Sequence, residues 1–151
     1  MRSARGRGRR PARAYLAVAL LAGSCCFSCK SDAERAHQGQ VARLAERIDR
    51  LRRADNDAKR EPLAALAAVP CPDADACALQ DLCLRGYRLH QSALDAIAAL
   101  DRLSRSDATP PADVGQRLAQ AQRDLTQAKS LTEACAEQQV RVVRHALVGG
   151  R

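Results

Sequence analysis

Residues 41–53, VARLAERIDRLRR, decide the fold of this chain. Their large apolar residues recur at spacings of three and four, which is typical of the seam of an amphipathic or coiled-coil helix. Charged residues fill the positions between them, and Glu46 precedes Arg50 by four residues, the order in which an i,i+4 ion pair stabilises a helix. The segment therefore predicts a helix whose apolar seam consists of Val41, Leu44, Ile48 and Leu51.

This first helix extends in both directions from the seam. Ser31 and Glu34 match a capping box, in which the hydroxyl and the carboxylate accept hydrogen bonds from backbone donors of the first turn. The helix is expected to run over about 32–61. Pro62 should end or kink it, and the apolar run over 62–69 is expected to form a short extension.

Two further long helices are expected over 75–105 and 110–147, which closes a helical domain at 32–147 and leaves a tail at 148–151. The apolar residues are mostly Ala, Leu and Val, and Ala and Leu are among the best helix formers. Three helices of similar length with short connections favour a small all-α fold, an up-down-up antiparallel three-helix bundle.

The first residues form a targeting segment. Residues 1–13 contain six Arg and no acidic residue, and an uncharged apolar run over 15–23 follows. A basic region, a short apolar region and small residues together predict a secretory signal peptide over 1–24. The apolar run is shorter than the roughly 20 residues that a transmembrane helix needs, so export is expected rather than a retained membrane span.

The sequence Leu21-Ala22-Gly23-Ser24-Cys25 resembles the lipobox of bacterial lipoproteins. This resemblance implies cleavage before Cys25, a diacylglycerol thioether on that residue, and an acylated amino terminus that carries fatty acids such as palmitate. Residues 25–31 would then be the lipidated cysteine and its tether, on the periplasmic side of a bacterial envelope. The outer membrane is favoured because Cys26, not Asp, follows the modified residue. Cys26 and Cys29 leave open which thiol is used, and an ordinary cleavable signal remains the alternative.

The charge of the chain does not indicate a nucleic-acid partner. The formal net charge of +8 comes largely from the signal peptide, and without it the chain has 19 basic and 17 acidic residues. The mature chain contains only two aromatic residues, Phe27 and Tyr87, so it offers no stacking surface for single-stranded nucleic acid.

Four cysteines follow the tether, and an exported chain with an even number of them suggests disulfides. If the second and third helices turn near residue 107, facing residues have numbers that sum to about 215, so either Cys77 or Cys83 could lie opposite Cys135. Cys83 lies on the apolar stripe of its helix, whereas Cys77 lies beside polar residues. This placement favours the pairs Cys83–Cys135 and Cys71–Cys77.

A periplasmic thiol or metal sensor that uses Cys83, His90 and Cys135 is the alternative interpretation of these residues. The cysteine spacings do not match the usual zinc motifs, and no nucleophile motif or phosphate-binding glycine loop occurs in the sequence. We therefore expect no catalytic residues, no metal and no cofactor.

The function favoured by the sequence is a membrane-tethered helical module, which is not an enzyme and has a binding or structural role. Its candidate interaction face is the seam Val41, Leu44, Ile48 and Leu51, and its partner would be another envelope protein or a second copy. The alternative is that this seam packs against the other two helices of the bundle.

Overall fold

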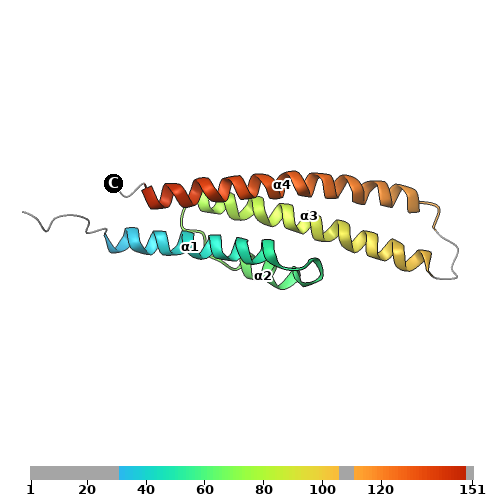
Figure 1. Cartoon of the computed structure of the whole chain (residues 1–151), viewed down its shortest axis with the longest axis horizontal. Coiled ribbons are helices and arrows are strands. Elements are labelled where there is room, and N and C mark those ends of the chain that lie inside the picture. The colour runs from blue at the N-terminus through green and yellow to red at the C-terminus, as the bar shows by residue number, and fades with distance from the viewer. Residues whose placement is uncertain (1–30, 106–110, 149–151) are drawn as a thin grey trace, which may run out of the picture. The chain divides into compact units, whose positions relative to one another are not determined.

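The computed structural model describes residues 31–105 and 111–148. These residues form four α-helices, α1 (Asp32–Arg53), α2 (Arg60–Ala67), α3 (Ala74–Ser104) and α4 (Val114–Val148), and a short 3-10 helix, Asn56–Ala58, between α1 and α2 (Figure 1). The described part of the chain contains no strand, and the expected all-α class is confirmed. The signal peptide and the cysteines of the tether lie outside the described residues.

Helix α1 begins where the capping box predicts and ends earlier than expected. The backbone N–H of Glu34 donates to Ser31 Oγ over 3.2 Å. At the other end, the Lys59 ammonium donates to the carbonyl oxygens of Leu51, over 3.3 Å, and of Ala54, which satisfies acceptors that the helix end leaves free. The expected extension over 62–69 is largely a separate helix, α2. Pro62 is its third residue, where a missing N–H removes no intrahelical bond.

Because α2 turns back, the four helices run up, down, up and down. Helix α1 therefore runs in the same direction as α3, and α4 runs antiparallel to both (Figure 1). The sequence predicts instead that the first two long helices are antiparallel. The contacts along the helices agree with this order: Gln38 of α1 donates to the Ala146 carbonyl of α4, and Arg52 donates to Gln139. The starts of α1 and α3 and the end of α4 consequently lie at one end of the bundle.

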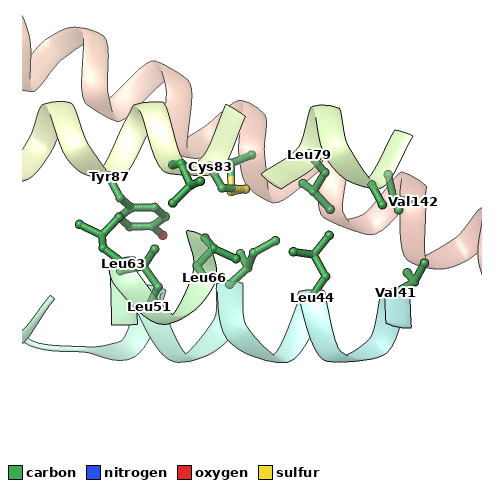
Figure 2. Packing of buried hydrophobic residues seen from close by; sticks show 13 residues of the cluster. Val41, Leu44, Leu51, Leu63, Leu66, Leu79, Cys83, Tyr87 and Val142 are labelled. Carbon is green, nitrogen blue, oxygen red and sulfur yellow. A yellow bond between two sulfur atoms is a disulfide. The ribbon is translucent and has the colours of Figure 1, made fainter. Parts of the chain in front are cut away.

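The core lies where α1 and α2 cover α3 and α4. Figure 2 shows its apolar side chains converging from all four helices. The largest side chains with almost no exposed surface are Leu44, Ile48, Leu51, Leu66, Leu79, Val41, Cys83 and Cys135.

Small residues let α3 and α4 approach each other closely. Ala93, Ala121 and Ala128 are buried, and an added Cβ at Gly86 would lie 3.0 Å from Leu131 Cβ. Within the described residues, no helix is both long enough and apolar enough to cross a membrane.

Candidate functional site

The seam that the sequence offers as an interaction face is part of the core. Val41, Leu44, Ile48 and Leu51 are each 2 % exposed or less. Leu63 and Leu66 of α2 join the same buried cluster, because α2 folds back alongside α1. The interaction-face prediction for these four residues is therefore corrected, since the structure leaves them no surface for another protein.

The structure joins the two cysteine pairs that the sequence favours. The Cα atoms are 5.1 Å apart in both the Cys71–Cys77 and the Cys83–Cys135 disulfide. Cys83 and Cys135 are fully buried, so their disulfide connects α3 to α4 inside the core. Cys71–Cys77 spans the start of α3 and holds the Pro-rich connection that precedes it.

A buried lysine lies beside the histidine that the sensor interpretation uses. Lys59 is buried and its Nζ lies 5.9 Å from the centre of the Tyr87 ring. Burial lowers the pKa of His90, and the positive charge of Lys59 lowers it further. Among the described residues, the buried His90 Nε2 has no hydrogen-bond partner.

This arrangement favours neither thiol nor metal chemistry at His90. Cys83 and Cys135 are bonded to each other, so neither offers a free thiolate. In the ranges 31–105 and 111–148, no group of three or more His, Cys, Asp or Glu residues could hold a metal ion. Lys59 was not identified from the sequence, because an isolated Lys after a turn is normally exposed.

Polar contacts hold three helix ends together at one end of the bundle. His37 Nε2 of α1 lies 2.5 Å from Asp73 Oδ2, and Asp73 caps α3 by accepting from the Ala76 backbone N–H over 2.7 Å. The bond from Ala76, and then the bond from His37, lower the pKa of Asp73. Gln38 donates to the Ala146 carbonyl over 2.8 Å, which adds the end of α4 to this group.

A cleft of about 580 Å³ separates α1 from α2 on the outer side of the core. Arg43, Glu46 and Arg47 of α1 line one wall, and Ala65 and Val69 line the other. The polar residues of this cleft come from α1 alone, and the opposite wall is apolar. Sites that fix a small ligand usually have polar groups that point at it from more than one side.

The exposed apolar surface gathers at the end of α4. Four large apolar residues are markedly exposed in the described chain, and three of them, Val140, Leu147 and Val148, fall in the last nine residues of that helix. The sequence did carry a signal for this surface, since 138–148 combines apolar and basic residues and contains no acidic one.

Comparison with known protein families, curated proteins and solved structures finds no match for this chain.

Proposed function

We propose that the protein is an envelope lipoprotein, tethered to a membrane through Cys25, whose helical bundle is a binding or structural module without enzymatic activity. The observation that carries the proposal is the lipobox-like sequence Leu21–Cys25 behind a basic leader. Ser31, which caps α1, follows Cys25 by only six residues, so the folded bundle begins almost directly after the proposed anchor.

Two disulfides support an exported location for the bundle. Disulfides form and persist in oxidising compartments such as the bacterial periplasm, and they are rare in the cytosol. Cys83–Cys135 and Cys71–Cys77 both have the spacing of a bridge. The periplasmic face of the envelope fits this chemistry, and Cys26 after the anchor favours the outer membrane by resemblance.

The buried disulfide also favours a module over a thiol or metal sensor. A sensing cysteine has to be accessible to its oxidant or to its metal. Cys83 and Cys135 are fully buried and bonded to each other, and burial and then the positive charge of Lys59 lower the pKa of His90. A cationic neighbour opposes both protonation of this imidazole and the approach of a metal cation.

A partner protein would have to bind the outside of the bundle, because the seam of α1 is core. The long hairpin of α3 and α4 is the largest element available for this role. At 1.5 Å per residue, the 31 residues of α3 measure about 46 Å. The hairpin can thus hold its far end well away from the tether, as a spacer or as a docking arm for another envelope protein or a second copy.

The test of the anchor is fractionation of a Cys25→Ala variant, with Cys26→Ala and Cys29→Ala as matched controls. We expect Cys25→Ala to remain unprocessed, without acyl chains, and both controls to be processed and membrane-bound. If Cys25→Ala is processed and retained in the membrane like the controls, Cys25 is not the anchor.

A further inference from the structure

The end of α4 exposes apolar side chains that its bundle does not cover. Val140 is 57 % exposed, Leu147 62 % and Val148 50 %. At 100° per residue, Val140 and Leu147 lie within about 20° of each other around the helix, with Val148 about 80° from Val140. We call these three residues, with Arg141 and Arg144, the α4 end patch.

The α4 end patch is rich in positive charge: 138–148 contains no acidic residue, and the nearest acid on the helix is Glu137, four residues before Arg141. Arg141, Arg144 and His145 are the ionisable residues of 138–148. Two acidic residues of the neighbouring helix starts already have partners, because Asp32 contacts Arg35 and Asp73 contacts His37. An apolar helix face with basic residues beside it is typical of segments that lie in the headgroup region of anionic membranes.

The tether enters the bundle at the same end. Gln38 of α1 contacts Ala146 of α4, so the start of α1 lies beside the end of α4 (Figure 1). Ser31 follows Cys25 by six positions, and a fully extended chain of six residues spans about 20 Å. An acylated Cys25 would therefore keep Ser31, at the start of α1, within about 20 Å of the lipid surface.

We infer that the α4 end patch contacts the headgroups of the membrane in which Cys25 is anchored. Val140, Leu147 and Val148 enter the boundary between headgroups and acyl chains, and Arg141 and Arg144 bind anionic phospholipid. The tether and this patch together give the bundle two points of contact with the membrane, which fix its orientation. The inference rests on the proposed anchor, and its test separates the two.

The chain contains no Trp, so Leu147→Trp in the full mature protein gives a single fluorescent reporter at the patch. Leu118→Trp is the matched control, because Leu118 is also exposed, at 42 %, but lies near the start of α4. The 29 residues between them correspond to about 44 Å along the helix. Both proteins are placed in vesicles of phosphatidylethanolamine and anionic phosphatidylglycerol that contain brominated acyl chains.

We expect the brominated lipid to quench Leu147→Trp and to leave Leu118→Trp unchanged, whereas acrylamide in the water should quench Leu118→Trp more strongly. Equal behaviour of the two reporters would overturn the inference. The intact mass of the same preparation reports acylation of Cys25 separately. If acyl chains are absent, the anchor fails, and the comparison of the two reporters still decides whether the patch touches lipid.

Charge reversal tests the headgroup assignment. Arg141→Glu with Arg144→Glu should reduce the brominated-lipid quenching of Leu147→Trp on anionic vesicles, whereas Arg117→Glu with Arg123→Glu, on the first half of α4, should not. Quenching that is unchanged by the first pair would refute the role of anionic phospholipid.

Discussion

Removing the Cys83–Cys135 disulfide should cost the bundle far more than removing Cys71–Cys77. The perturbation is replacement of both members of one pair by Ala, so that neither variant contains a new unpaired thiol from that bridge. The first bridge closes a separation of 52 residues and the second a separation of 6. The two variants thus share the same Cys→Ala substitution and differ in the length of the loop that the lost disulfide had closed.

The loop lengths set the expected magnitudes. The chain-entropy relation gives about 4 kcal/mol for a loop of 52 residues and about 2 kcal/mol for a loop of 6. Cys83 and Cys135 are also fully buried, so losing their sulfur atoms leaves space in the core and increases the cost. A loss of about 4 kcal/mol is a large share of the roughly 5–15 kcal/mol that stabilises an ordinary domain.

Urea denaturation followed by circular dichroism at 222 nm measures both losses, with intact mass confirming the remaining bridge in each variant. We expect the Cys83→Ala, Cys135→Ala protein to lose more free energy of unfolding than the Cys71→Ala, Cys77→Ala protein, by about 2 kcal/mol. Equal losses, or a larger loss for the second variant, would contradict the cross-core bridge between α3 and α4.

Three further substitutions test the packing and the polar contacts. Gly86→Ala should destabilise the bundle or leave it unchanged, because the new Cβ meets Leu131 Cβ at 3.0 Å. Gly39→Ala is the control, and because Gly39 has open space around it, this substitution should stabilise the bundle by about 0.5–1 kcal/mol in thermal or urea melts. Equal gains at both sites would show that α3 and α4 are not closely packed. Lys59→Met should lower the free energy of unfolding by about 1–3 kcal/mol, because it leaves carbonyl groups at the end of α1 without a donor. The control Lys129→Met removes an exposed ion pair and should cost less than about 0.5 kcal/mol. Similar losses in the two variants would contradict the helix-capping role of Lys59. The pKa of Asp73 lies below its ordinary value of 3.8, so its stabilising contribution is present above pH 3.8 and is lost as the pH falls through the lowered pKa. The difference in free energy of unfolding between Asp73→Asn and the parent protein should therefore shrink as the pH falls through that range. A difference that does not change with pH would contradict a lowered pKa for Asp73.

The helical pattern of the sequence predicts most of this fold because local rules govern it. The capping box at Ser31, the Val41–Leu51 seam and the stripe with Cys83 each depend on residues within a few turns, and the structure has helices at all three places. Helix direction depends on tertiary packing instead. Whether the segment after Arg53 continues α1 or folds back is decided by burial of Leu63 and Leu66 against the seam, and the local sequence pattern does not contain this contact.

The same distinction explains the outcome for the candidate sites. The sequence favours Cys83–Cys135 because pairing across antiparallel helices follows from periodicity and register alone. It offers the α1 seam as an interaction face because periodicity shows that a face is apolar but does not show what covers it. Lys59 was not identified, since its burial depends on how the chain turns after α1. The α4 end patch was not identified, although 138–148 combines apolar and basic residues.

The intact mass of the native protein extracted from its membrane decides whether Cys25 is the lipid anchor of the bundle. We expect a chain that begins at Cys25, contains two disulfides, and carries the added mass of a diacylglycerol and an amide-linked fatty acid at its first residue. A mature chain with no added acyl mass, or one that begins after Cys25, would contradict it.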